Sequence, residues 1–316
     1  MHDLISIPRK SKFQNFFKTS DDMELQGVYR WHQSLSSSFF AVMNDFEVVL
    51  RNTIHFTLSN YYDSCENDSF DWMGVSVIQD KKAPMHIKHQ LTGKRVKDKK
   101  FGFKYTGSLG KIEDAISQLS RGGKSLTPDA VIAELSFAFW PQVIKQLKPK
   151  FHDDKRSELL KAMFPNAPTY DNDFIGLLTS ILEQVRLFRN RLGHHDSLLN
   201  FPEISNLGGV GFFPKKPRHT LTSLEKMLKL IRIVLEWIDK DIILYFENSD
   251  PWVRLEQLIC KDMLGFYRYY HGKSNCFVGG IDYAHKIKKS RFLSIKRKSR
   301  KPKYPKEYKA IKSYYF

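Results

Sequence analysis

The chain has 316 residues, of which 41% are hydrophobic and 14% aromatic. It is therefore long enough to bury a core and too apolar to be disordered. Its 51 lysines and arginines against 34 acidic residues give a formal net charge of +17, which favours a polyanionic partner, nucleic acid before membrane. Cys65, Cys260 and Cys276 are far apart and lack CxxC spacing, which argues against a disulfide framework or a zinc ribbon and predicts a reduced, cytoplasmic location.

The most apolar window, residues 227–246, is interrupted by charges at helical spacing. Such charges are incompatible with a membrane-spanning helix, and the N-terminus lacks the apolar run of a signal peptide. We therefore expect no membrane segment.

Apolar periodicity predicts an all-α fold, a bundle of roughly antiparallel helices. In chain order, we expect helices over residues 23–63 (one long helix or two in series), 125–147, 154–164, 171–195, 221–246 and 251–270. Thr127 is the expected N-cap of the second of these, with Pro128 just inside. Residues 67–110 are expected to form a long basic loop or insertion, and residues 208–213 a short extended piece.

The aromatic block Phe137, Phe139 and Trp140 lies at helical spacing beside Leu135. We expect it to belong to the core, in preference to forming a platform for base stacking.

The segment RNRLGHHD, residues 189–196, places groups with acid–base and phosphate-binding chemistry near a helix end. Asn190 and His194 are four residues apart and can share one helix face, and Arg189 can reach the same rim. A histidine can transfer a proton at neutral pH, a guanidinium can hold a phosphate, and Asn can orient the reacting group. Taken alone, however, basic residues and a glycine are also typical of an ordinary helix end.

Three segments resemble the Abi-like (abortive infection) proteins that carry a HEPN ribonuclease motif. RNRLGHHD is similar to the Arg-Asn-x-x-x-His motif of HEPN ribonucleases. Residues 29–55 are similar to the N-terminal helix of the family, and residues 131–144 to its central Glu-Leu-Ser-Phe-x-Phe-Trp block. The order and rough spacing of the three segments also agree, over residues 21–246.

The resemblance implies a HEPN-like helical bundle that cleaves RNA without a metal or other cofactor, leaving a 2′,3′-cyclic phosphate. It assigns phosphate binding to Arg189, orientation to Asn190 and general acid–base chemistry to His194, with His195 in reserve. Two such motifs usually face each other across a homodimer. The corresponding domain would span residues 1–246, including the 67–110 insertion, and residues 247–316 would add an extra helix and a basic tail.

A second Arg-Asn pair occurs in EVVLRNTIH. Glu47, Arg51 and His55 are spaced four residues apart and can share one helix face. The favoured interpretation is that Glu47 and Arg51, with Asn52 beside them, assist by orienting the catalytic arginine. A surface ion pair and a second catalytic half remain as alternatives.

The basic residues expected to contact RNA lie near the motif, in the insertion and in the tail. They are Arg186, Arg191, Lys99, Lys100, Lys104, Lys296, Arg297, Lys298, Arg300 and Lys301. Residues 286–312 carry thirteen lysines and arginines against Glu307 alone, a net charge of +12. No cluster of residues with metal-ligand spacing is present, so no metal site is expected.

The first functional hypothesis is an endoribonuclease, a toxin-like effector in phage defence or a toxin–antitoxin system, whose partners would be RNA and an antitoxin of protein or RNA. The second is a non-catalytic RNA-binding or RNA-sensing protein that uses the same basic surface. The third is an interaction protein whose charge serves solubility. Net charge supports the first two equally, so only the motif separates them.

Overall fold

The computed structural model describes residues 5–62, 71–73, 76–78, 86–88, 108–150, 152–205 and 209–270. These residues form the helices α1 (Ile7–Phe17), α2 (Asp22–Tyr62), α3 (Ser108–Arg121), α4 (Pro128–Glu134), α5 (Phe139–Lys150), α6 (Asp153–Met163), α7 (Asn172–Gly193), α8 (Pro217–Ile238), α9 (Lys240–Glu247), α10 (Asp250–Leu258) and α11 (Lys261–Tyr270). Two single 3-10 turns, Asp71–Met73 and Leu198–Asn200, complete the helical part. The predicted all-α fold is confirmed, and none of the described helices is both long and apolar enough to cross a membrane.

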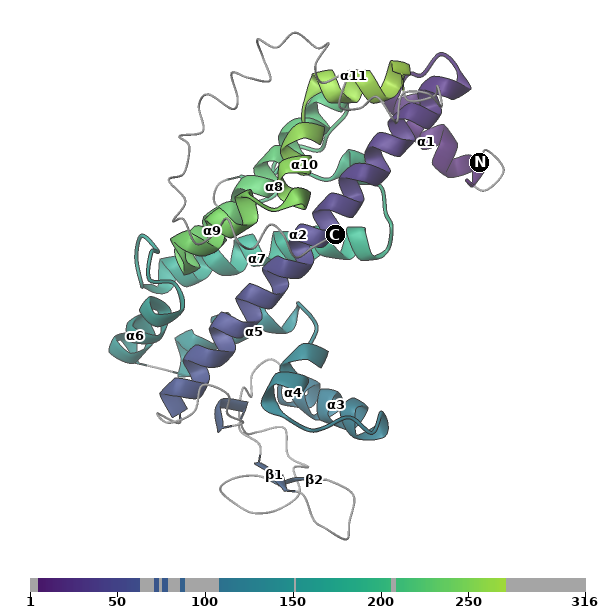
Figure 1. Ribbon diagram of the computed structural model, residues 1–316. Coiled ribbons are helices and arrows are strands. Elements are labelled where there is room, and N and C mark those ends of the chain that lie inside the picture. Colours follow the sequence, from purple (N-terminus) through teal and green to yellow (C-terminus); the bar gives the residue numbers. More distant parts are fainter. Residues whose placement is uncertain are drawn as a thin grey trace, which may run out of the picture.

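Helix α2 is the axis of the molecule, because it runs from the N-terminal elements to the far end of the bundle (Figure 1). At 41 residues it is about 60 Å long. Its apolar residues recur every three or four positions and are buried along its length, among them Trp31, Phe39, Phe46, Leu50 and Ile54. Helices α1, α5, α6, α7, α8, α10 and α11 all pack against it.

The hydrophobic core continues across the expected domain boundary at residue 246. Trp252, Leu255 and Leu258 of α10 are buried in the same cluster as Trp31 and Leu35 of α2. The Trp31 indole N–H also donates a hydrogen bond to the Leu258 carbonyl, at 2.9 Å. In the structure, the expected extra helix after residue 246 is therefore part of the main bundle.

Three expected helices are each divided in two. The break between α4 and α5 precedes Pro141, whose nitrogen cannot donate the hydrogen bond that a continuous helix needs. Asp239 ends α8 in an extended conformation and caps α9, accepting from the Asp241 N–H at 2.6 Å. Ile259 and Cys260 separate α10 from α11.

Other details of the expected fold are settled by the described residues. Thr127 caps α4 by accepting from the Ala130 N–H at 3.1 Å, as predicted. The aromatic block is in the core, with Phe137, Phe139 and Trp140 all at most 2% exposed. The extended piece in 208–213 is limited to one antiparallel bridge, between Ile204 and Val210.

The expected insertion contains more regular structure than a loop. Strands β1 (Ser76–Ile78) and β2 (His86–Lys88) pair antiparallel, with Val77 opposite Ile87. Helix α3 already begins at Ser108, before the expected end at 110. Helix α1 was not expected from periodicity, although Pro8 in its first turn is a start signal.

Candidate active site

The motif RNRLGHHD forms the last turn of α7 and the loop that follows it. The helix begins at a regular cap, where Asp171 accepts a hydrogen bond from the Phe174 N–H at 2.9 Å. Its apolar side packs inward, and the Phe188 ring lies edge-on against Phe39 and Phe201 at 4.8 and 4.9 Å. Phe188 therefore anchors the turn that carries Arg189.

Arg189 and Glu47 meet between α7 and α2. The Arg189 Nε lies 3.4 Å from the Glu47 carboxylate, and this buried nitrogen has no hydrogen-bond partner among the described residues. Glu47 is only 15% exposed, whereas Arg189 is 39% exposed. The carboxylate thus attracts one edge of the guanidinium while the rest of the side chain remains open to solvent.

Arg51 and Asn52 lie one turn beyond Glu47 on α2 and are half-buried. The Arg51 Nε and the Asn52 Oδ1 are buried, and neither atom has a hydrogen-bond partner among the described residues. Glu47 is thus the residue of the second motif that approaches the first, through Arg189.

His55 has no part in this arrangement. It is fully buried, and its Nδ1 accepts a hydrogen bond from the Trp72 indole at 2.9 Å. The burial of this imidazole and its hydrogen bond to Trp72 do not favour a second catalytic half that uses His55, and that alternative stays untested.

His194 and His195 follow the helix and have exposed side chains. The His194 N–H donates to the Asn190 carbonyl at 2.9 Å, so His194 continues the helical path of Asn190. His195 has φ 53°, with its N–H bound to the Leu192 carbonyl, and the Asp196 N–H is bound to the Arg191 carbonyl. This pattern is a Schellman motif with histidine at the left-handed position.

Two residues outside the motif hold the loop, and neither was predicted to belong to the site. His32 of α2 is 2% exposed, and its Nε2 accepts from the Leu198 N–H at 3.0 Å. Burial lowers the pKa of His32 to about 3, and the positive charges of Arg9 and Lys12 act in the same direction. The Arg9 guanidinium donates to the His195 carbonyl at 2.7 Å. The signal for His32 was its position on the buried side of α2, four residues after Val28.

The two arginines expected near the motif have partners within the protein. Arg186 pairs with Glu183, with an Nε–oxygen distance of 2.8 Å, and this hydrogen bond lowers the pKa of Glu183. Arg191 donates to the Ser197 carbonyl at 3.3 Å and stacks over Phe201. Their expected RNA contacts stay predictions, while the other expected contacts, Lys99, Lys100, Lys104, Lys296, Arg297, Lys298, Arg300 and Lys301, lie outside the described residues.

Chemically, residues 189–195 at the end of α7 carry a half-buried guanidinium, a half-buried amide and two exposed imidazoles. Within the described residues, no group of three or more histidine, cysteine or acidic side chains is placed to hold a metal ion. The arrangement can bind a phosphate through Arg189 and exchange a proton through His194.

Comparison with known proteins gives one result. A family model described as Abi-like protein matches residues 4–200. No match was found among curated proteins or among solved structures. Since residues 4–200 are well over half of the 316-residue chain, the protein belongs to the Abi-like family.

Proposed function

We propose that this protein is a HEPN-type, metal-independent endoribonuclease. The observation that carries the proposal is the end of α7, where Arg189 is held by Glu47 and His194 is exposed one turn further on. Side chains of these types supply a phosphate-binding cation and a proton-transfer group at one edge. The Abi-like family match supports the same conclusion, since it spans the motif.

The proposed reaction is a transesterification within the RNA. The ribose 2′-oxygen forms a bond to the adjacent phosphorus, and the bond from phosphorus to the 5′-oxygen of the next nucleotide breaks. A base removes the 2′-hydroxyl proton and an acid protonates the departing oxygen, and His194 takes one of these roles. Arg189 stabilises the charge on the phosphorane, Asn190 orients the phosphate, and the product is a 2′,3′-cyclic phosphate.

The reaction needs two proton-transfer groups, a base and an acid. One motif supplies His194 as one of them, and a second copy of the chain would supply the other. Leu187 precedes His194 by two turns on the same face of α7 and is 40% exposed. Phe40 and Val48 are 43% and 40% exposed on α2, on either side of Glu47 in sequence. These exposed apolar residues beside the site support a homodimer with a composite active site.

The family is named for abortive infection. We therefore propose that the enzyme is a cytoplasmic, toxin-like effector in phage defence or in a toxin–antitoxin system, held in check by a protein or RNA antitoxin.

Cleavage of labelled RNA in excess EDTA tests the ribonuclease proposal. Wild-type protein is expected to cleave, and His194→Ala and Arg189→Ala are expected to lose at least about a hundredfold in rate. Once bound antitoxin has been excluded, wild type that cleaves no better than His194→Ala across several RNA pools would overturn the enzyme. RNA that is bound with high affinity and recovered intact would establish the non-catalytic RNA-binding function instead.

The role of Glu47 has its own test. Glu47→Gln keeps the shape of the side chain but removes the charge that faces Arg189, so cleavage should fall by about tenfold or more. The free energy of unfolding should change by less than about 1 kcal/mol, because the pair is partly exposed. Glu158→Gln, which removes the exposed ion pair with Lys155 on α6, is the matched control and should leave cleavage unchanged.

A further inference from the structure

A hairpin-like turn follows the active-site loop and carries exposed apolar side chains. The Glu203 N–H donates to the Phe212 carbonyl, and the Gly211 N–H donates to the Glu203 carbonyl, both at 2.8 Å. Phe212 and Phe213, on the returning arm, are 45% and 55% exposed. Two neighbouring aromatic side chains with this much exposed surface do not contribute fully to the core, and such exposed apolar groups are typical of a binding site.

The same arm leads directly into three exposed cations, Lys215, Lys216 and Arg218. Neither lysine forms an ion pair with any of the residues that the structure describes. The nearby acid Glu203 is instead paired with Lys226 of α8. The positive charge beside the two phenylalanines is thus uncompensated.

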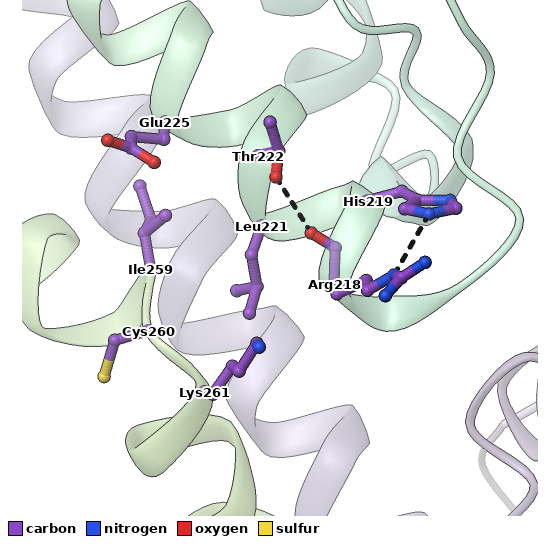
Figure 2. A pocket seen from close by; sticks show the side chains of 8 residues that line it. All are labelled: Arg218, His219, Leu221, Thr222, Glu225, Ile259, Cys260 and Lys261. Atoms are coloured by element: carbon purple, nitrogen blue, oxygen red, sulfur yellow. Dashed lines mark hydrogen bonds between the residues drawn. The ribbon is translucent and has the colours of Figure 1, made fainter.

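A pocket of 490 Å³ opens next to these residues, between the start of α8 and the junction of α10 and α11 (Figure 2). Leu221 and Ile259 are its apolar lining residues, and Arg218 and Lys261 are its cationic ones. In Figure 2 the Lys261 side chain extends towards Leu221, and the Arg218 guanidinium is turned towards His219. Glu225 also lines it, but its carboxylate is bound by Lys229 at 2.8 Å. A volume in the range of about 300–1,000 Å³ is that of small-molecule sites.

Direct contacts join the exposed arm to the pocket. The Phe212 ring lies edge-on to the His219 ring, with centroids 5.0 Å apart. The Arg218 Nε donates to the His219 Nε2 at 3.3 Å (Figure 2). A continuous surface therefore runs from the two phenylalanines through His219 to the pocket.

This surface is fixed relative to the active site. The Thr220 hydroxyl donates to the Leu199 carbonyl at 2.7 Å, and the Ser223 hydroxyl donates to the Phe201 and Pro202 carbonyls at 2.8 Å. Leu199 is five residues after His194, so their Cα atoms are at most about 18 Å apart.

We propose that Phe212, Phe213, Lys215, Lys216, Arg218 and Lys261 form a binding surface for single-stranded RNA, here called the aromatic–basic edge. Unpaired bases stack on the two phenylalanines, and the pocket receives a nucleotide whose phosphates contact Arg218 and Lys261. Stacking rings combined with uncompensated cations are the chemistry of single-strand binding, whereas a partner protein would require acidic groups to match. The inference rests on the proposed ribonuclease and adds where its substrate is held.

The test is the fluorescence anisotropy of a labelled 12-nucleotide oligouridine, titrated with the full chain in a His194→Ala background at fixed salt. Each of Phe212→Ala and Phe213→Ala should raise Kd by about fivefold or more, because one stacked base is lost. Lys261→Glu should also raise Kd, and all three variants keep the basic tail. Tyr245→Ala on α9, which removes an aromatic ring that is 67% exposed, is the matched control and should bind like the parent. A blunt RNA duplex should show no loss with the phenylalanine variants.

Unchanged oligouridine affinity in the Phe212→Ala/Phe213→Ala double variant, with its melting temperature retained, overturns the aromatic–basic edge. If the same double variant instead changes the sedimentation of the protein, the surface is a protein contact and the RNA assignment is wrong. Wild-type cleavage is measured separately. Cleavage that persists in His194→Ala would contradict the proposed active site. It would not affect the conclusion about RNA binding, which comes from the anisotropy titrations.

Discussion

His195 ends α7 in a backbone conformation that glycine adopts most readily. Its φ of 53° is in the left-handed region, where a Cβ costs roughly 1–2 kcal/mol. Gly193, two residues earlier, is inside the helix, and a Cβ there would meet nothing within 4 Å. A usual helix end has glycine at the left-handed position, whereas here that position holds His195 and the glycine lies within the helix.

This exchange predicts that His195→Gly is stabilising. Relief of the left-handed Cβ exceeds the extra chain entropy of glycine, so the free energy of unfolding should rise by about 0.5–1 kcal/mol. The backbone carbonyl that accepts from Arg9 is retained. Urea unfolding measures the change, and a loss of stability would show that the His195 side chain itself holds the loop. If His195→Gly still cleaves RNA at the wild-type rate, the His195 side chain has no part in the reaction.

His32 makes stability depend on pH. Its pKa is about 3 in the folded protein, below the ordinary value of 6.5, so the unfolded chain binds more protons between these values. The contribution of His32 to the free energy of unfolding is complete above about pH 6.5. Between that pH and the folded pKa of about 3, it falls by about 1.4 kcal/mol for each pH unit. Comparison of unfolding at pH 7 and pH 5.5 measures this loss. In His32→Gln the slope should flatten, and an unchanged slope would assign it to other groups.

At the scale of the elements, α2 and α11 touch so closely that one position tolerates only glycine. A Cβ on Gly27 would lie 2.0 Å from the Tyr267 carbonyl oxygen. Gly27→Ala should therefore displace α11 and lower the free energy of unfolding by about 1–3 kcal/mol. Gly265→Ala, within α11 and with open space at its Cβ, is the control and should stabilise by about 0.5–1 kcal/mol. Equal effects of the two substitutions would contradict the close approach.

Periodicity predicted most helices because the buried stripes of α2, α7 and α8 are long and regular. It did not find the break before α11, where the Cys260 sulfur accepts from the Met263 N–H. A cysteine thiol is no recognised cap, so the sequence holds no signal there.

Helix geometry relates Asn190 to His194, but spacing alone was equally typical of a helix end, and the resemblance to the HEPN motif is what singled these residues out. The interpretation that Glu47 orients the catalytic arginine agrees with its approach to Arg189, although the way α2 crosses α7 cannot be read from spacing along α2. The hydrogen bond of His32 to Leu198 joins residues 166 positions apart, and spacing within one helix does not predict it.

At the scale of the whole molecule, charge is distributed unevenly. Residues 286–312 hold +12 of the total +17. Deleting the residues after His285 should therefore make RNA binding less sensitive to salt, by about 0.7 in the log–log slope for each phosphate that the shortened protein no longer neutralises. Anisotropy titrations at several salt concentrations measure the slope. If the slope is unchanged, the tail does not bind RNA.

Contacts between the two ends of the described chain also set the order of assembly. Trp31 bonds to a carbonyl 227 residues later, and Glu24 pairs with Arg268, 244 residues later. At ribosomal rates of about 5–20 residues per second, α10 and α11 are synthesised roughly 10–50 s after the start of α2. Its buried stripe, which positions both Glu47 and His32, is incomplete during that time. We expect nascent chains that end before residue 250 to be protease-sensitive and inactive, a property measurable on stalled ribosomes. We therefore expect the proposed active site to form only after α10 and α11 have been synthesised.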